Sequence, residues 1–439
     1  MTEQQIVGLG LAFARYLDGF RGYFSDRRAV EHLRSYCRGL LADLPRKSVE
    51  PIALASGTAV RTLQEFLRDY AWDHAGVRDQ VQRRVTAGLA DTPDPIGTVG
   101  IVDETSAAKK GAKTPGVQRQ YLGCAGKTGN GIVTVHLGVA RGRFKALLDA
   151  DLFLPESWDA DRERCRAAGI PDGVTYRPKW RIALDQVRRA VANGVRLDWV
   201  AFDEGYGDKP GFLAGLEESG LTYAGEVPRD FPCAGGRAEV VAASDPAFTG
   251  QRWRAVRVPH QSEPDAVWEV RAARVRFRRD KRPTAGEYWL IVARNRRTEA
   301  VKFFASNAPA GIPPARLVRA AFARWNVEHA FRVAKSEVGL THYEGRSYVG
   351  LIRHLVLCLV VMGFVALRAG DLRGEKPGGD AGAGVPGAER PLRRPAGPAA
   401  RETGRAEHAA AVIQYHQARN RAARESKRKR DRPPRPLPK

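Results

Sequence analysis

The sequence predicts an α/β protein in which helices cover both faces of a mixed sheet. Three apolar runs that read as strands follow one another at residues 96–103, 120–125 and 131–140, with Gly and Lys turns between them. A helical pattern at 180–193 then leads into another apolar run at 197–202. Consecutive strands followed by alternating helix and strand are typical of such a sheet. The 439 residues leave room for about two to four domains with an ample core.

Residues 1–92 have a helical pattern throughout. Apolar side chains recur at helical spacing from Arg27 to Leu44. Two shorter helical stretches then flank Gly57, which predicts either a helix-turn-helix or an ordinary helical hairpin. In a helix-turn-helix, the second helix would present Arg61 and Arg68 to DNA.

The next part of the chain divides into a core and an insertion. Residues 93–229 are expected to form the first part of the core and residues 306–368 the second part. Between them, residues 230–305 alternate apolar with basic side chains, which predicts half-exposed antiparallel strands. A basic sheet face that carries aromatic residues such as Trp253 would suit a phosphate backbone, although a merely solvated face has the same pattern.

The last part of the chain should contain two helices and two irregular segments. Helical patterns cover residues 314–338 and 347–368. Residues 369–404 are rich in Gly, Pro, Ala and Arg without periodicity, which predicts a disordered linker, and residues 405–439 form a basic tail. The longest uncharged apolar run, 355–367, is too short to cross a bilayer, so we expect a buried core helix and no membrane partner.

Charge and cysteine content indicate the kind of binding partner and the cellular compartment. A formal net charge of +23 favours a polyanionic partner such as nucleic acid, although Arg exceeds Lys, which can reflect nucleotide composition of the coding sequence. The five cysteines are scattered without a C-x-x-C pair, which argues against a structural zinc site and for a reducing compartment. No signal peptide is apparent, so a cytoplasmic protein is expected.

Three carboxylates are the best candidates for chemistry. Asp103 and Asp203 each close an apolar run that reads as a buried strand, so each should emerge at a strand end. Glu328 lies in a helical stretch in which Arg324 and Lys335 fall within roughly 40° of it on an ideal helix. One helix face would then offer a carboxylate between two cations, which suits a divalent metal held beside a phosphate. The simpler alternative for Glu328 is a surface ion pair with Arg324.

These residues lie in ordered blocks that resemble those of DDE insertion-sequence transposases. The first block spans residues 103–123, the second spans 203–207, and the third combines 306–309 with 324–346. A stretch of the tail, 413–420, also resembles the end of such proteins. The likeness covers nearly the whole chain apart from the linker, and the three blocks in this order are far more specific than any one of them.

The resemblance implies an RNase H-like fold with a β-rich insertion between the second aspartate and the glutamate. It also implies a signature of Tyr, Arg, Glu and Lys on the helix of the third block. Arg324, Glu328 and Lys335 have the expected spacing, but Ala321 stands where relatives have the tyrosine. The departure puts one contact with the DNA end in doubt and leaves metal binding unaffected.

The implied activity is cleavage and joining of DNA at transposon ends. Phosphodiester cleavage needs an activated water and a stabilised leaving oxygen, which two Mg²⁺ ions, or Mn²⁺ as a substitute, can supply. Asp103 would bridge both ions, and Asp203 and Glu328 would each hold one. The implied partners are double-stranded DNA, both terminal inverted repeats and target, and a second copy in a homodimer. The residues expected to contact DNA are Arg324, Lys335, Lys110, Arg119, Arg61, Arg68 and Trp253.

Two other functions stay open on the sequence alone. One is a DNA-binding regulator of related elements with an inactive nuclease core. The other is an endonuclease of the same fold that cuts without joining, because it would use the same carboxylates.

Overall fold

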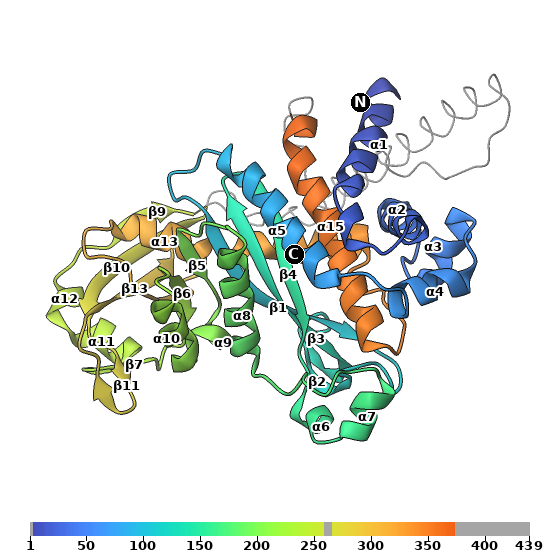
Figure 1. Ribbon diagram of the computed structural model, residues 1–439. Coiled ribbons are helices and arrows are strands. Elements are labelled where there is room, and N and C mark those ends of the chain that lie inside the picture. The colour runs from blue at the N-terminus through green and yellow to red at the C-terminus, as the bar shows by residue number, and fades with distance from the viewer. Residues whose placement is uncertain (1–2, 259–265, 374–439) are drawn as a thin grey trace, which may run out of the picture.

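The computed structural model describes residues 3–258 and 266–373 and shows an α/β protein with two five-stranded sheets (Figure 1). In the first sheet the strand order is β2-β3-β1-β5, and β4 also pairs with β3. The pairings are antiparallel except that of β1 with β5, which is parallel. The strands of this sheet are β1 (Val99–Ala108), β2 (Gln118–Leu122), β3 (Lys127–Arg141), β4 (Phe144–Leu152) and β5 (Trp199–Ala201).

The second sheet is antiparallel throughout and has the order β6-β14-β13-β10-β9. A parallel bridge between Val200 and Tyr223 joins it to the β5 side of the first sheet. Its strands are β6 (Ala224–Val227), β9 (Arg254–Arg257), β10 (Val267–Val275), β13 (Tyr288–Asn295) and β14 (Val301–Ser306). Two small hairpins, β7–β8 (Pro232–Cys233, Gly236–Arg237) and β11–β12 (Arg278–Arg279, Arg282–Pro283), accompany it.

Two features of the first sheet differ from the prediction. The apolar pattern does not predict β4, which pairs with β3 along most of its length. In addition, Asp103 lies inside β1 rather than at its end, because pairing with β3 continues as far as Ala108 opposite Gly131. The parallel pairing with β5, by contrast, stops at Ile101.

Helices at the N-terminus precede the first sheet, as predicted. Gly57 ends the first helix of the predicted helix-turn-helix in the left-handed region, with a φ of 65° that glycine adopts without strain. The elements are α1 (Glu3–Asp18), η1 (Arg21–Tyr23), α2 (Arg27–Leu41), α3 (Val49–Ser56), α4 (Val60–Arg68) and α5 (His74–Ala90).

The helices predicted at 180–193 and 347–368 are present, but the pattern did not predict the short helices within 156–167, 204–207 and 238–249. The single helix expected at 314–338 is broken near Ala323 and ends in a π turn, η2 (Ala334–Val338). At the break, the rings of Phe322 and Trp325 lie 4.5 Å apart and both contact Trp268 of β10. The helices are α6 (Glu156–Asp159), α7 (Arg162–Ala167), α8 (Lys179–Ala192), α9 (Glu204–Gly207), α10 (Pro210–Glu218), α11 (Ala238–Ser244), α12 (Pro246–Thr249), α13 (Pro314–Phe322), α14 (Trp325–Val333) and α15 (Tyr348–Arg373).

Helix α15 is the central helix of the hydrophobic core. Its segment Tyr348–Ala369 is long and apolar enough to cross a membrane, but 94% of its most apolar part is buried inside the protein. It packs against β4, α5, α2 and α4. Because α15 continues to Arg373, the predicted linker does not begin at residue 369; the rest of the linker and the basic tail, 374–439, lie outside the described residues.

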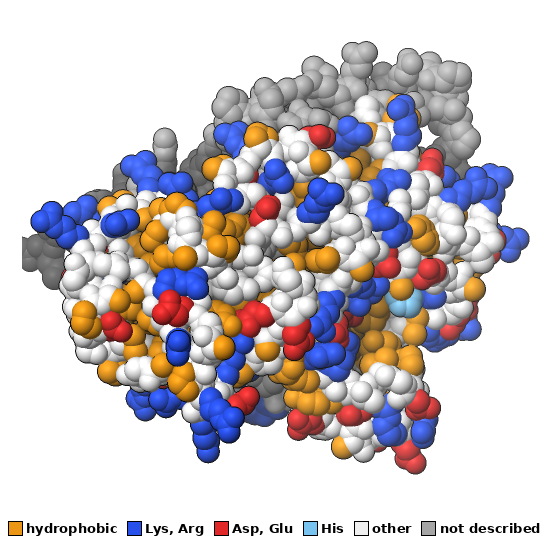
Figure 2. All heavy atoms as spheres, turned by 60° about the vertical axis from the view of Figure 1, so that its left-hand side comes forward, with side chains coloured by type: hydrophobic (Ala, Val, Ile, Leu, Met, Phe, Trp, Pro, Cys, Tyr) orange, Lys and Arg blue, Asp and Glu red, His pale blue; other side chains and the backbone are white. Residues whose placement is uncertain are grey.

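Positive charge is spread over the surface. Figure 2 shows Lys and Arg side chains around much of the outline of one face, with acidic side chains among them. Many Lys and Arg side chains form ion pairs within the chain, such as Arg27 with Glu31 and Arg229 with Glu239. Net charge therefore does not mark a path for DNA, and each cation has to be judged by its own partners.

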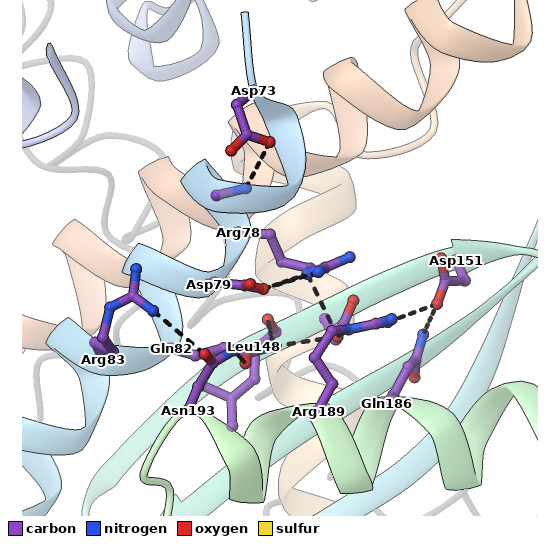
Figure 3. Close-up of polar contacts among 12 residues, drawn as sticks. Asp73, Arg78, Asp79, Gln82, Arg83, Leu148, Asp151, Gln186, Arg189 and Asn193 are labelled. Carbon is purple, nitrogen blue, oxygen red and sulfur yellow. Dashed lines mark hydrogen bonds and ion pairs between the residues drawn. The ribbon is translucent and has the colours of Figure 1, made fainter. Parts of the chain in front are cut away.

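A buried polar network joins the N-terminal helices to the first sheet (Figure 3). Asp149 of β4 is fully buried and accepts hydrogen bonds from Arg189 of α8, at 2.8 Å, and from Gln82 of α5, at 3.1 Å. Arg189 also pairs with Asp151, at 2.9 Å. A buried carboxylate is tolerated only with such partners, so the network fixes α5 and α8 on β4.

Candidate active site

The pairing of β1 with β5 brings two of the predicted carboxylates together. The strands run parallel with Ile101 opposite Ala201. Continuing this register by two residues places Asp103 beside Asp203. Their charges interact, because the carboxylate of Asp203 raises the pKa of Asp103. Two aspartates that are distant in sequence thus become neighbours through strand register.

Asp103 is held in a largely buried position that disfavours its ionised form. Burial raises the pKa of its carboxyl to about 7, the positive charge of Arg324 acts in the opposite direction, and the charge of Asp203 adds to the rise. Its Oδ1 accepts a hydrogen bond from the backbone N–H of Glu104, at 2.7 Å. Its Oδ2 accepts one from Nη1 of Arg324, at 3.0 Å.

Asp203 caps the short helix α9 at the end of β5. Its Oδ1 accepts from the backbone N–H groups of Gly205, at 3.0 Å, and Tyr206, at 3.3 Å. No described residue donates a hydrogen bond to Oδ2 of Asp203. The cap fixes the carboxylate beside Asp103 and leaves one oxygen for another ligand.

Arg324 lies between two carboxylates rather than beside one. Its guanidinium contacts Asp103 at 3.0 Å and Glu328 at 3.6 Å. The side chains of Arg324 and Asp103 are 15% and 13% exposed, whereas that of Glu328 is 52% exposed. One cation thus bridges two carboxylates, and the contact with Asp103 is the part of this arrangement that helical spacing alone does not predict.

Lys335 approaches the same site from the π turn. The turn changes the helical spacing on which its prediction depends, and π turns recur at functional sites. Its Nζ lies 5.6 Å from the centre of the Phe331 ring. Burial lowers the pKa of Lys335, while the charges of Cys124 and Asp103 raise it. Lys335 thus lies close enough to Asp103 for their charges to interact.

A tyrosine that the sequence argument did not select also belongs to the site. Tyr206 is buried, and its hydroxyl has no hydrogen-bond partner among the described residues. Burial raises its pKa well above 10, and the negative charges of Glu104, Asp103 and Asp203 raise it further. Its place three residues after Asp203 is the one sequence signal that could have identified it.

Two neighbours of Asp103 complete the surroundings. His136 lies opposite Asp103 on β3 and is fully buried. Burial lowers the pKa of His136 to about 3, so its ring is neutral at neutral pH. Glu104, the residue after Asp103, is engaged by Lys179 Nζ at 2.7 Å. The carboxylate of Glu104 is therefore already paired with a cation.

The carboxylates of Asp103, Asp203 and Glu328 are suitable ligands for a hard divalent cation, provided that Arg324 moves. Carboxylates are the ligands that Mg²⁺ prefers. Burial is the main cause of the raised pKa of Asp103, and a bound cation would favour its ionised form. Within residues 3–258 and 266–373, however, no three acidic, His or Cys side chains approach closely enough to form a metal site. Arg324 already supplies the positive charge between Asp103 and Glu328, so these carboxylates could hold a metal only if its guanidinium turned away.

Among the other residues predicted to contact DNA, two form ion pairs and two do not. Arg61 pairs with Glu65 and Arg68 with Asp69, each at 2.8 Å, on the exposed side of α4. Lys110 and Arg119 are exposed, and neither has an ion pair or a side-chain hydrogen bond within the described part of the chain. These four contacts stay predictions.

Trp253 and Ala321 bear on the remaining predictions. The ring of Trp253 is covered by the guanidinium groups of Arg271, at 4.4 Å, and Arg294, at 4.9 Å. A base could stack there only by displacing one of them. Ala321 is buried in α13, with 3% of its surface exposed, so this position offers DNA no side chain.

Comparison with known proteins shows the family to which the chain belongs. A model of the family described as DDE superfamily endonuclease matches residues 19–285, more than half of the chain. The chain therefore belongs to the DDE superfamily endonuclease family. It is also 33% identical over 211 residues to the probable transposase for insertion sequence element IS701 of Microchaete diplosiphon. The resemblance to DDE insertion-sequence transposases is thereby confirmed.

The extent of these matches limits what they support. The alignment with the relative spans 47% of this chain and 51% of the relative, so the chain matches about half of that protein's length. The family match includes Asp103 and Asp203 and ends before Glu328. The assignment of Glu328 therefore depends on its contact with Arg324 and on the spacing of the third block.

Proposed function

We propose that the protein is a transposase that cleaves and joins double-stranded DNA at the ends of an insertion element. Family membership supports DNA transposition in general. The observation that carries the specific proposal is the β1–β5 register, which, continued by two residues, sets Asp103 beside Asp203. The antiparallel strands β1 and β3, with β5 parallel to β1, also support an RNase H-like core.

Asp103, Asp203 and Glu328 would hold the divalent ions, most suitably Mg²⁺. When bound, two ions activate the attacking oxygen and stabilise the leaving oxygen of a phosphodiester. The protein's own cations would position the DNA: Arg324 can grip a phosphate through two N–H groups, and Lys335 adds a point charge. If the Arg324 guanidinium turned away from Asp103 toward a DNA phosphate, the carboxylates of Asp103 and Glu328 would both be free to bind cations.

Cleavage and joining require only one site. Hydrolysis at the element's end breaks the bond to the 3′ oxygen and leaves a 3′ hydroxyl. In the joining step that hydroxyl attacks another phosphate and displaces its 3′ oxygen. Both steps are in-line displacements at phosphorus, so the same carboxylates and cations serve both. We expect a homodimer to hold the two ends of the element together.

The proposal is tested by cleavage of a labelled duplex that contains the element's terminal repeat, with Mg²⁺ or with EDTA. Wild-type protein should cut at the repeat boundary only with Mg²⁺, and Glu328→Gln should bind the duplex without cutting it. Glu204→Gln, at a carboxylate next to Asp203 that we do not assign as a ligand, is the matched control and should cut normally. A joined or hairpin product would establish the transposase, and cutting without either would establish the endonuclease.

One observation favours a second function, that of an inactive DNA-binding regulator. Arg324 occupies the space between Asp103 and Glu328, and Ala321 replaces the expected tyrosine. Binding of the repeat by wild-type protein without any Mg²⁺-dependent cutting would support the regulator and contradict the transposase.

A further inference from the structure

Beyond the carboxylate site, strands β2 and β3 form a two-stranded ribbon that extends past the first sheet. Residues 127–131 of β3 pair with β2. Pairing of β3 with β1 begins only at Gly131, and pairing with β4 only at Thr134. Residues 127–130 therefore have β2 as their sole ladder partner, and we call residues 118–130 the β2–β3 ribbon.

The ribbon and the loop before it carry positive charge without compensation. Four cations here are exposed, and none has an ion pair or a side-chain hydrogen bond among the described residues: Lys110, Lys113, Arg119 and Lys127. The sequence has no Asp or Glu between Glu104 and Asp149. Asn130 ties the loop to the ribbon, because its Nδ2 donates to the carbonyls of Lys109 and Gly111, at 2.8 and 2.9 Å. Cations left unpaired in this way are available to phosphates.

An exposed aromatic side chain lies among these cations. Tyr121 is 65% exposed and shares a strand face with Arg119, two residues before it. It is the one large aromatic side chain that stands exposed among residues 3–258 and 266–373. The other face of the ribbon is closed by Leu122, whose side chain packs over Gly129 and Gly131. The exposed face of the ribbon therefore carries Arg119 and Tyr121, whereas Lys127, which pairs with Leu122, lies beside the turn on the other face.

The turn of the ribbon adjoins the carboxylate site. The backbone N–H of Cys124 donates to Oγ of Ser106, at 3.1 Å. Ser106 lies on β1, three residues beyond Asp103. The charges of Cys124 and Asp103 also both act on the pKa of Lys335. DNA whose phosphate lies at the carboxylates must therefore pass close to the ribbon.

We propose that the β2–β3 ribbon enters the major groove of the DNA duplex next to the cleaved phosphate. Arg119 would contact a phosphate, and Tyr121, on the same face, would lie against the edge of a base or sugar, while Lys127 beside the turn would contact a second phosphate. A two-stranded β-ribbon fits the width of the major groove of B-DNA. The inference rests on the proposed function, because it takes the cleaved phosphate to lie at Asp103 and Asp203.

The chain offers a direct probe of this geometry, since Cys124 is exposed and the other four cysteines are buried. A thiol-reactive iron chelate on Cys124 would cut DNA wherever the turn of the ribbon lies. We expect cuts clustered in the base pairs next to the cleavage site. The control is Cys124→Ser combined with Arg282→Cys, which carries the same reagent on the β11–β12 hairpin of the second sheet (Figure 1). Cuts from Cys124 that are absent, or no different from those of the control, would overturn the proposal.

Substitutions on the ribbon give an independent measurement by fluorescence anisotropy with the same duplex. Arg119→Ala should lower the slope of log affinity against log salt by about 0.9, the value for one lost phosphate contact. Tyr121→Ala should lose about fivefold in affinity, because covering about 40 Å² of ring contributes about 1 kcal/mol, and Tyr121→Phe should keep most of it. The matched control Arg282→Ala should bind like wild type.

The failure of this proposal can be told from the failure of the proposed function. If wild-type protein cuts the repeat with Mg²⁺ while both ribbon variants bind like Arg282→Ala, the ribbon does not contact DNA and the transposase proposal stands. If wild-type protein neither binds nor cuts the repeat, both proposals fall. If the reactivity of Cys124 falls as protein concentration rises without DNA, a second copy of the chain covers the ribbon and the DNA contact is wrong.

Discussion

The carboxylate of Asp103 is costly to ionise where the fold places it. Burial and the neighbouring charge of Asp203 raise its pKa to about 7, and one guanidinium only partly offsets them. Functional sites often contain carboxylates with a raised pKa of this kind, because a bound cation can supply the positive charge that the protein does not. Two predictions at the scale of single residues follow from this electrostatic imbalance.

The first prediction concerns stability and pH. Asp103→Asn should stabilise the protein in EDTA at pH 8 by up to about 4 kcal/mol, and by much less at pH 5. Below the unfolded pKa, near 3.9, Asp103 is protonated in both states and costs nothing. As pH rises toward the folded pKa of about 7, the wild-type protein loses stability and the asparagine variant does not. Chemical denaturation at several pH values measures the difference.

A control separates this effect from a general change in charge. Asp91→Asn removes a carboxylate at the end of α5 whose side chain is exposed. Its effect on the free energy of unfolding should not grow with pH in the same window. A stability difference for Asp103→Asn that stays constant from pH 5 to pH 8 would show that the carboxyl of Asp103 is not perturbed.

The second prediction concerns Arg324. Arg324→Ala should destabilise the metal-free protein by about 2 kcal/mol at neutral pH, because it leaves the mostly buried carboxylate of Asp103 without a cation. Mg²⁺ should then raise the melting temperature of Arg324→Ala more than that of wild type, since the ion would no longer compete with the guanidinium. Arg324→Lys should lie between the two, because an ammonium cannot bridge two carboxylates as a planar fork does. Equal Mg²⁺ effects in all three proteins would contradict competition at this position.

At the residue scale, local pattern carries only part of the information about the site. Asp103 and Asp203 could be selected because each follows an apolar run, and the register then made them neighbours. The position of Arg324 between Asp103 and Glu328 could not be predicted, because helical spacing gives the direction of a side chain only if the helix continues unbroken. Tyr206 was missed because its proximity to the carboxylates depends on the cap at Asp203.

At the scale of elements, the segment 314–338 departs most from its sequence pattern. Apolar residues continue at helical spacing through the whole stretch, so the pattern predicts one helix. The break near Ala323 instead coincides with the packing of Phe322 and Trp325 on Trp268, which belongs to the second sheet. Contacts between distant segments of this kind leave no local signal. For β4, the acidic residues Asp149 and Asp151 interrupt the apolar pattern, and partners distant in sequence, above all Arg189 on α8, explain why they lie there.

Gly339, at the end of the π turn, provides the prediction at this scale. Its φ of 78° favours glycine, and a Cβ there would lie 2.6 Å from Cβ of Lys47, which is too close to the backbone to move easily. Gly339→Ala should therefore cost about 2–4 kcal/mol of stability and slow cleavage by displacing Lys335. Gly57→Ala is the control: its φ is 65° with open space around it, so only the backbone cost of about 1 kcal/mol applies. Denaturation measures the free energy of unfolding of both variants. Equal decreases would show that Lys47 moves aside and that its contact with the new Cβ costs nothing.

At the scale of the whole molecule, the N-terminal helices and the first sheet share one hydrophobic core. Phe13 of α1 packs on Phe364 of α15 with ring centres 4.7 Å apart. Arg353 of α15 donates to the carbonyls of Leu67 and Trp72, at 3.2 and 3.1 Å. Sequence pattern predicted the boundary near residue 92 from the change from helical to strand-like spacing. Periodicity reports the type of element and not which elements pack together, so a shared core could not be predicted.

This sharing predicts that residues 1–92 and the first sheet unfold together. Separating α5 from β4 would expose the apolar face of α15 and remove Gln82 from the fully buried Asp149. Each of these costs several kcal/mol, comparable to the whole stability of a typical domain. Native-state hydrogen exchange measures this directly: the slowest amides of α2 and α5 should exchange with the same free energy as those of β3. Asp149→Asn, which weakens the network in Figure 3, should lower both values equally. If the amides of α2 and α5 instead opened at a clearly lower free energy and the variant lowered only theirs, the N-terminal helices would form a separate domain, able to move when the protein binds DNA.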